Sequence, residues 1–244
     1  MHHAVVERWS RGSSLLHRRD PRAKVAVLLV FLVVLASAHH SLPAISGGLL
    51  LLLILGLRFA RVPVMRAIAG AAVVLPFTLV FAAALWLSGD LQRGLALVMK
   101  AYLSALAVLV VIATTPIPLF VRGLETTGAP RFLLMIAQFL YRYLFVISEE
   151  AQHMAKAAAS RGATVRGLLG RRARFHAAAG ALAVLFARSY SRAEGIHKAM
   201  LARGFSGRLP TLGALRFRAA DAGFLVLTSV LLVLLRAIAE SVTL

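Results

Sequence analysis

Two stretches of the chain carry the same residue types at the same spacing. Their sequences are Lys156-Ala157-Ala158-Ala159-Ser160-Arg161-Gly162 and Lys198-Ala199-Met200-Leu201-Ala202-Arg203-Gly204. Both contain strong helix formers, and a glycine just past the last helical residue commonly ends a helix. We therefore expect each arginine at an exposed helix end, where its planar guanidinium can bind a carboxylate. The small residue before it, Ser160 or Ala202, would let a partner approach closely.

A single chain that presents this motif twice suits a partner with two-fold symmetry, which offers one binding groove per identical subunit. The alternative is that each arginine only complements the dipole of its helix, a contribution of about 0.3–1 kcal/mol. Arg-Gly would then recur by chance in a chain rich in both residues. The spacing alone leaves both interpretations open.

Residues that could catalyse a reaction or hold a metal ion are scarce. The sequence has no cysteine, no Gly-x-x-x-x-Gly-Lys-Ser/Thr phosphate loop and no Ser-His-Asp, His-Glu-x-x-His or Gly-x-Ser-x-Gly pattern. Glu149 and Glu150 diverge by about 100° on a helix, so we expect them to pair with Arg142 or other arginines. His2-His3 and His39-His40 lack further ligands for a metal shell. We predict neither enzymatic activity nor a bound metal or cofactor.

The composition indicates a membrane protein with a basic face. Of the 244 residues 60% are hydrophobic and only 15% charged, yet the formal net charge is +19. Soluble domains usually carry about a quarter charged residues. The dominance of apolar residues also excludes a disordered chain.

Runs without Asp, Glu, Lys or Arg place five predicted membrane spans near residues 25–38, 44–57, 67–89, 101–121 and 221–236. As one helix, residues 25–57 would measure about 50 Å against a hydrocarbon core of about 30 Å. Pro43 divides this run into a helical hairpin. Pro76 lies inside the third span, and Thr114-Thr115-Pro116 should end the fourth helix early. The predicted fold is an all-α polytopic membrane protein.

The distribution of Lys and Arg predicts the orientation. Six precede the first span, none lies in the turn at 39–43, and sixteen of the 28 lie between Arg122 and Arg218. Positive residues favour the inner side, so we expect the N terminus and this insert inside and the C terminus outside. The basic start leads into a long apolar hairpin, so we expect no cleavable signal peptide. The predicted parts are 1–121, a cytoplasmic region at 122–218 and a last span within 219–244.

The insert should be helical. Phe132–Ser148 is apolar and aromatic but contains Arg142, which favours an interfacial or protein-buried helix. We expect Glu149-Glu150 to open a new helix that ends at Gly162, and residues 191–203 to form another that ends at Gly204.

These residues together resemble the T component of energy-coupling factor (ECF) transporters, the EcfT/CbiQ family, and most closely its CbiQ cobalt and nickel branch. The resemblance covers about residues 15–240. The matching motifs, in order, are His17-Arg18-Arg19-Asp20-Pro21-Arg22-Ala23-Lys24, Thr114-Thr115-Pro116, Tyr141-Arg142-Tyr143 with Glu149-Glu150-Ala151, and the two Arg-Gly motifs.

The resemblance implies that Ser160-Arg161-Gly162 and Ala202-Arg203-Gly204 are the family's paired signatures. In that family these end cytoplasmic coupling helices and seat in two ATPase subunits, CbiO- or EcfA-like, which hold the ATP and Mg²⁺. The first signature departs from the family by Ser for Ala, and we expect coupling to be retained. A separate CbiM-like membrane subunit, with or without a CbiN-like one, would hold the cobalt or nickel ion. The expected location is the bacterial inner membrane.

Two other hypotheses make different predictions. A self-contained carrier or channel, with a basic insert that binds anionic lipid, would transport a solute without partners. The near absence of polar residues from the spans speaks against it. A nucleic-acid tether would use the positive charge for phosphates. The charges lack interleaved aromatic residues, and the positive-inside bias explains most of them, so we expect no nucleic-acid partner.

Overall fold

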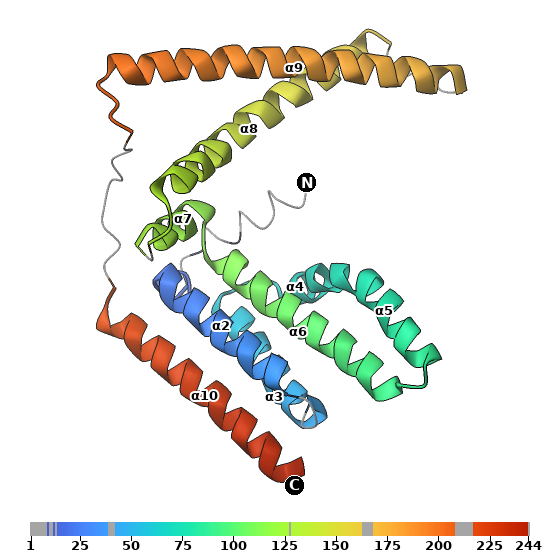
Figure 1. Cartoon of the computed structure of the whole chain (residues 1–244), viewed down its shortest axis with the longest axis vertical. Coiled ribbons are helices and arrows are strands. Elements are labelled where there is room, and N and C mark those ends of the chain that lie inside the picture. Colours follow the sequence, from blue (N-terminus) through green and yellow to red (C-terminus); the bar gives the residue numbers. More distant parts are fainter. Residues whose placement is uncertain are drawn as a thin grey trace. The chain divides into compact units, whose positions relative to one another are not determined.

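The computed structural model describes residues 9, 12, 14–38, 42–126, 128–162, 168–207 and 217–243. All regular elements within these residues are helices (Figure 1), which confirms the all-α prediction. In chain order they are α2 (Pro21–Ser37), α3 (Leu42–Phe59), α4 (Val64–Ala71), the 3₁₀ turn η1 (Ala72–Val74), α5 (Leu75–Leu87), α6 (Leu91–Thr114), α7 (Ile117–Thr126), α8 (Arg131–Ser160), α9 (Leu168–Ala202) and α10 (Ala219–Thr243).

The chain divides into two compact units. The first comprises Met1–Thr127 and Leu215–Leu244, and therefore holds α2 to α7 together with α10. The second is Gly128–Ala214, which contains α8 and α9.

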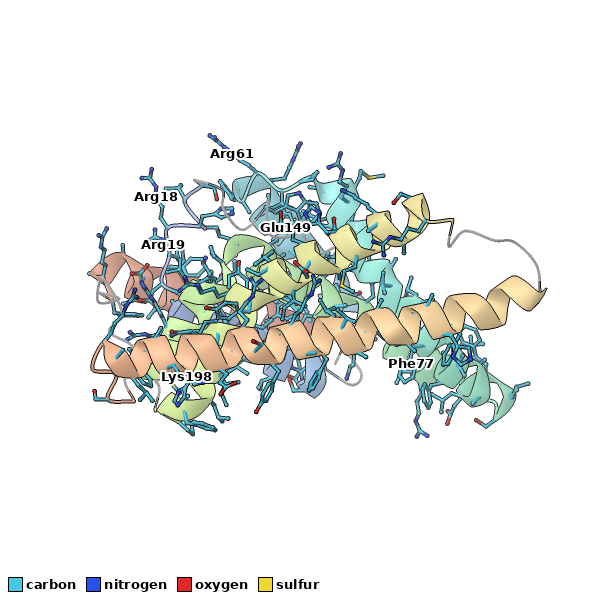
Figure 2. All side chains as sticks on the ribbon, turned by 90° about the horizontal axis from the view of Figure 1, so that it is seen from above. Arg18, Arg19, Arg61, Phe77, Glu149 and Lys198 are labelled. Carbon is cyan, nitrogen blue, oxygen red and sulfur yellow. The ribbon has the colours of Figure 1, made fainter. Side chains whose placement is uncertain are left out.

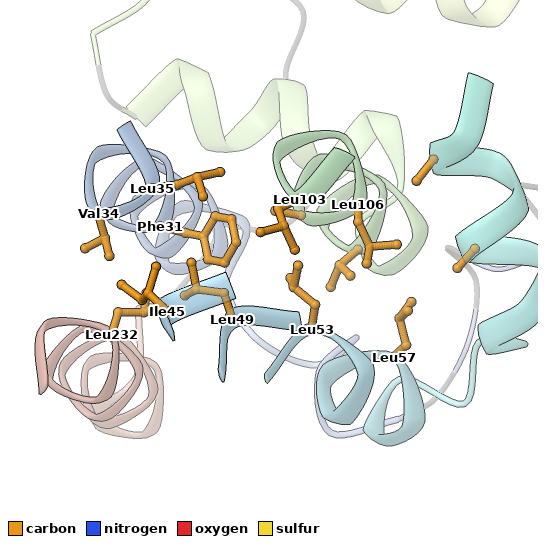
Figure 3. Packing of buried hydrophobic residues seen from close by; sticks show 14 of the residues in the cluster. Phe31, Val34, Leu35, Ile45, Leu49, Leu53, Leu57, Leu103, Leu106 and Leu232 are labelled. Atoms are coloured by element: carbon orange, nitrogen blue, oxygen red, sulfur yellow. The ribbon is translucent and has the colours of Figure 1, made fainter. Parts of the chain in front are cut away.

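Helices α2, α3, α6 and α10 supply most of the hydrophobic core of the first unit. The α3 contribution recurs every four residues, so it lies on one face of that helix. Outward-facing side chains such as Phe77 and Leu231 stay exposed, as is typical of helices that face lipid. The buried side chains labelled in Figure 3 are Phe31, Val34, Leu35, Ile45, Leu49, Leu53, Leu57, Leu103, Leu106 and Leu232.

Within the part of the chain that the structure describes, four helical stretches are long and apolar enough to cross a membrane: Val64–Leu87, Leu91–Thr114, Phe132–Ser160 and Ala219–Ser241. Ile45–Phe59 is a shorter apolar helix. Three of these four overlap the predicted spans near 67–89, 101–121 and 221–236, and the last of the three contains its predicted span entirely. The predicted hairpin corresponds to α2, which has 17 residues, and α3. The chain is a multi-pass membrane protein.

The third predicted span contains a 3₁₀ turn where proline interrupts it. Pro76 has no N–H to donate to the Ala72 carbonyl. That carbonyl instead accepts a hydrogen bond from the Leu75 N–H at the end of η1. The neighbouring turn thus satisfies the freed acceptor, as membrane helices require.

The predicted start of the fourth span was wrong. Helix α6 begins at Leu91, ten residues before the expected 101, although its end at Thr114 agrees with the early stop predicted from Pro116. The charges that set the expected boundary fit within the helix. Arg93 forms an ion pair with Asp90 at 2.8 Å, and Lys100 Nζ donates to the Ala36 carbonyl at 3.0 Å.

The predicted helix boundary at Glu149-Glu150 was also wrong. Helix α8 continues without a break from Arg131 to Ser160, and its length and composition place it among the candidate spans. Arg142 is exposed on this helix, with its guanidinium carbon 5.8 Å from the centroid of the Tyr143 ring. An exposed charge would be costly in lipid, so the exposure of Arg142 favours the interfacial position expected from the sequence over a membrane crossing.

Candidate functional site

The first Arg-Gly motif forms an exposed end of α8. Ser160 is the last helical residue, Arg161 is the C-cap and Gly162 has φ +81°, a conformation that favours glycine. The Arg161 N–H donates to the Ala157 carbonyl at 3.3 Å. The Ser160 hydroxyl also donates to this carbonyl, at 2.9 Å. The serine that departs from the family pattern therefore turns its hydroxyl back onto its own helix.

The second Arg-Gly motif ends α9 in a similar way. Gly204 has φ +76° and donates to the Leu201 carbonyl at 3.0 Å. The Phe205 N–H donates to the Met200 carbonyl at 3.0 Å, which completes a Schellman motif. Arg203 is exposed between these bonds. Both arginines thus follow a last helical turn and precede a glycine with positive φ, as the sequence predicted.

Helices α8 and α9 pack as an antiparallel pair that diverges. Arg188 forms an ion pair with Glu150, which confirms that this glutamate pairs with an arginine of the insert. Away from this contact an apolar groove of about 510 Å³ separates the helices, lined by residues that include Phe139, Tyr143 and Ile196. Because the helices run in opposite directions, their C-terminal ends lie on opposite sides of the contact (Figure 1).

The lengths of the two arms follow from the helix rise. Arg161 lies 11 residues beyond Glu150, and Arg203 lies 15 residues beyond Arg188. At 1.5 Å per residue these arms measure about 16 Å and about 22 Å. The second unit therefore presents two similar arginine ends that are well separated and point in different directions.

The partners expected for Glu149 and Arg142 differ from those observed. Glu149 Oε1 lies 3.9 Å from Nε2 of His153 on the next helical turn, and both side chains are exposed. Arg142 lies beside Tyr143 instead. The expected pairing of an arginine thus holds for Glu150 alone of these two glutamates. Neither carboxylate is placed for acid–base chemistry with the other.

A second cluster of motif residues lies in the first unit and is buried. Lys24 is 4% exposed, and its Nζ donates to the Thr114 carbonyl at 2.7 Å and to Oγ1 of Thr115 at 3.2 Å. This ammonium therefore binds the C-terminal end of α6, where it complements the helix dipole. Pro116 follows at once, and its carbonyl accepts from Leu119 and Phe120 as α7 begins.

Two carboxylates complete this cluster at the starts of α2 and α10. Asp20 caps α2 by accepting from the Arg22 N–H at 2.9 Å, and Pro21 occupies the first turn. Asp221 accepts from the Arg218 N–H at 3.0 Å and from the Asp20 N–H at 3.2 Å. One buried aspartate thereby joins the N-terminal ends of two helices.

The aspartate of α10 and the role of Lys24 were missed by the sequence analysis. Asp221 belongs to none of the recognised motifs, although it is an isolated acid at the start of an apolar run. Its burial, at 4% exposure, and the salt bridge from Arg19 Nη1 at 3.8 Å show that it is structural. The available signal in the sequence was an isolated acid at the start of an apolar run, in a chain whose first span is preceded by a basic segment.

The described part of the chain contains no group of three or more His, Asp or Glu side chains that could hold a metal ion. His2-His3 and His39-His40 lie outside the described residues.

Comparison with known proteins supplies the family. The model of the CbiQ family, described as cobalt transport protein, matches residues 12–212. The chain belongs to the CbiQ family. This match includes both Arg-Gly motifs. It also includes Asp20, Lys24, Thr114 and Thr115 of the buried cluster around Lys24, whereas Arg218 and Asp221 lie beyond it.

Two relatives extend the comparison to most of the chain. The energy-coupling factor transporter transmembrane protein EcfT of Bacillus selenitireducens is 30% identical over 83% of this chain and 84% of its own length. The protein of the same name from Acidaminococcus fermentans is 30% identical over 80% of this chain and 81% of its own. The similarity of this CbiQ family member thus extends over nearly the full length of both relatives.

Proposed function

We propose that this CbiQ family member is the transmembrane coupling subunit of an ATP-driven ECF importer. The observation that carries the proposal is the pair of similar arginine ends on α8 and α9, each closed by a glycine with positive φ. Two separated ends on one asymmetric chain suit two ATPase subunits related by two-fold symmetry. Each guanidinium would bind an acceptor in its ATPase, Arg161 in one and Arg203 in the other.

In this proposal the chain transmits motion and does no chemistry. The ATPase subunits, CbiO- or EcfA-like, bind ATP and Mg²⁺ and change their separation during hydrolysis. The antiparallel pair α8–α9, joined by Glu150 and Arg188, lies on the inner side in this proposal, so α8 does not cross the membrane even though its length and composition would allow it. This pair passes the movement to the membrane helices. The buried cluster around Lys24 and Asp221 stabilises the ends of α2, α6 and α10, so that these helices respond together.

The transported substrate belongs to a partner subunit. A CbiM-like membrane protein, alone or with a CbiN-like one, would hold cobalt or nickel and contact the exposed apolar helix faces of this chain. The family's description as cobalt transport protein supports this choice of ion. The complex would lie in the bacterial inner membrane, with the N terminus of this chain inside and its C terminus outside.

Charge reversal tests the docking assignment. The tagged chain would be co-expressed with the genes that flank it and purified in detergent, and the ATPase recovered per chain would be measured. Arg161→Glu with Arg203→Glu should abolish ATPase recovery, because both guanidinium contacts become repulsive. Arg58→Glu with Arg66→Glu makes the same charge change at exposed residues in the last turn of α3 and in α4, and it should leave recovery intact.

The proposal is contradicted if the double variant Arg161→Glu with Arg203→Glu recovers as much ATPase as the unchanged chain. The comparison requires that the variant and the unchanged chain insert into the membrane equally well. The rival hypothesis of a self-contained carrier gives a different outcome. It predicts that the purified chain alone moves a divalent ion into liposomes, whereas the coupling subunit alone would not.

A further inference from the structure

A second, smaller groove lies within the first unit between α2 and α7. Its volume is about 210 Å³. Val25 and Leu29 line it from α2, and Phe120 and Leu124 line it from α7. Leu29 is 57% exposed, while Phe120 and Leu124 are 38% and 36% exposed. The groove is therefore an open apolar channel along α2.

The two helices approach closely at one end of this groove. A Cβ atom at Gly123 would lie 3.4 Å from Cβ of Pro21, an ordinary van der Waals distance, so α7 lies against the first turn of α2 there. Phe120 and Leu124 flank Gly123 and are separated by four residues, which directs both to the same side of α7. Helix α7 therefore contacts α2 at Gly123, and the side chains of Phe120 and Leu124 form an apolar face beside this contact.

Arg22 closes the groove at the same end. It lies three residues before Val25 and seven before Leu29, so the groove extends about 10 Å from the arginine along the helix. Its Nε is buried without a hydrogen-bond partner among the described residues, and Asp20 Oδ1 lies 3.8 Å away. The carboxylate of Asp20 is already engaged by the Arg22 N–H.

The charge around this end is positive. Arg18 is exposed and extends away from the helices (Figure 2), and Arg22 keeps a quarter of its side chain exposed. The nearest carboxylate of the same helix, Asp20, is buried. Glu125 on α7 is exposed and follows the lining residue Leu124, as Asp20 precedes the lining residue Pro21.

We propose that this groove binds one acyl chain of an anionic glycerophospholipid, whose phosphate contacts the Arg22 guanidinium. A membrane protein is surrounded by such lipids, and a cation at the end of an apolar channel matches their order of headgroup and tail. The guanidinium fork suits a phosphate better than an ammonium would. This binding site is separate from the coupling ends and does not depend on the proposed transport role.

Quenching by brominated lipid tests the site in the full-length chain. A Phe120→Trp probe would be reconstituted with brominated phosphatidylglycerol or brominated phosphatidylcholine, and the signal of the parent chain, which contains Trp9 and Trp86, would be subtracted. The ratio of the two quenching efficiencies gives the relative affinity. We expect about a fivefold preference for the anionic lipid, the factor equivalent to the roughly 1 kcal/mol that one arginine contributes at an anionic membrane.

Matched variants distinguish lipid binding in this groove from a general attraction of anionic lipid to the basic chain. A Phe77→Trp probe on α5, at a position that is 69% exposed (Figure 2), should show a ratio near one. Arg22→Gln should reduce the preference at the Phe120→Trp probe to near one, whereas Arg66→Gln should preserve it. Added inorganic phosphate should leave the ratio unchanged, because the apolar channel selects the lipid and not the free anion.

A further variant keeps the test valid if Arg22→Gln fails to fold. Ala26→Leu fills part of the groove and leaves every charge in place, so it should lower quenching of the Phe120→Trp probe by both lipids. The proposal is overturned by equal ratios at the two probes, by a preference that Arg22→Gln does not change, or by displacement with free phosphate. Absence of quenching at the Phe120→Trp probe would also overturn it, since a protein segment would then cover the groove.

Discussion

Replacing Lys24 by methionine should destabilise the first unit strongly. Met preserves the length and the apolar contacts of the side chain but removes the ammonium. The Thr114 carbonyl and the Thr115 hydroxyl then lose a charged donor in a site where Lys24 is only 4% exposed. A hydrogen bond to a charged group contributes about 1.5–3 kcal/mol to stability. Burying methionine costs less desolvation free energy than burying an ammonium, and this difference offsets part of the loss of the two bonds. The expected loss is about 3 kcal/mol.

The assay is thermal unfolding of the purified chain in detergent, followed by circular dichroism at 222 nm. For a chain of this size 1 kcal/mol shifts Tm by about 2–4 °C, so Lys24→Met should lower Tm by about 6–12 °C. The control is Lys100→Met, which removes a lysine bond to the Ala36 carbonyl at a more exposed site. It should cost less than about 1 kcal/mol. Equal shifts for the two variants would refute the claim that the Lys24 cluster stabilises the unit.

Three further predictions follow from single backbone or hydroxyl positions. Gly204→Ala should destabilise the end of α9 by about 1 kcal/mol, because Gly204 has positive φ. Gly195→Ala, within the same helix, should stabilise α9. Hydrogen exchange of the last turn of α9 would show both effects. Arg61→Gly should raise Tm, since Arg61 has φ +55°, and a lower Tm would contradict this. Ser160→Ala should leave ATPase recovery unchanged, because the hydroxyl already bonds its own helix.

The helix ends at Gly162 and Gly204 were predictable because they depend on neighbouring residues alone. Gly162 and Gly204 adopt positive φ directly after the last turns of α8 and α9, which is a common way for a helix to end. The placement of both arginines followed directly. Their role in binding a partner depends on a surface outside this chain and stays a prediction.

The start of α6 and the continuity of α8 past Glu149-Glu150 were not predictable from charge alone. Lys100 suggested the start of a span because an isolated charge is costly in an apolar run, and Arg142 suggested an interfacial or buried helix for the same reason. In the structure Lys100 reaches the Ala36 carbonyl, 64 residues earlier, and Arg142 lies beside an aromatic ring. The partner of Lys100 comes from tertiary packing, about which hydropathy along the sequence contains no information, whereas the ring beside Arg142 belongs to the next residue, Tyr143.

The bond between Asp20 and Asp221 also has a consequence for the synthesis of the chain. It joins residues 201 positions apart, so the first helix meets its partner only after the last has left the ribosome. At 5–20 residues per second this interval lasts roughly 10–40 s. The segment that forms α8 and α9 is made within it. Nascent chains that stop before α10 would therefore contain α8 and α9 and both arginine ends, but an incomplete first unit in which the Asp20 N–H lacks its bond to Asp221.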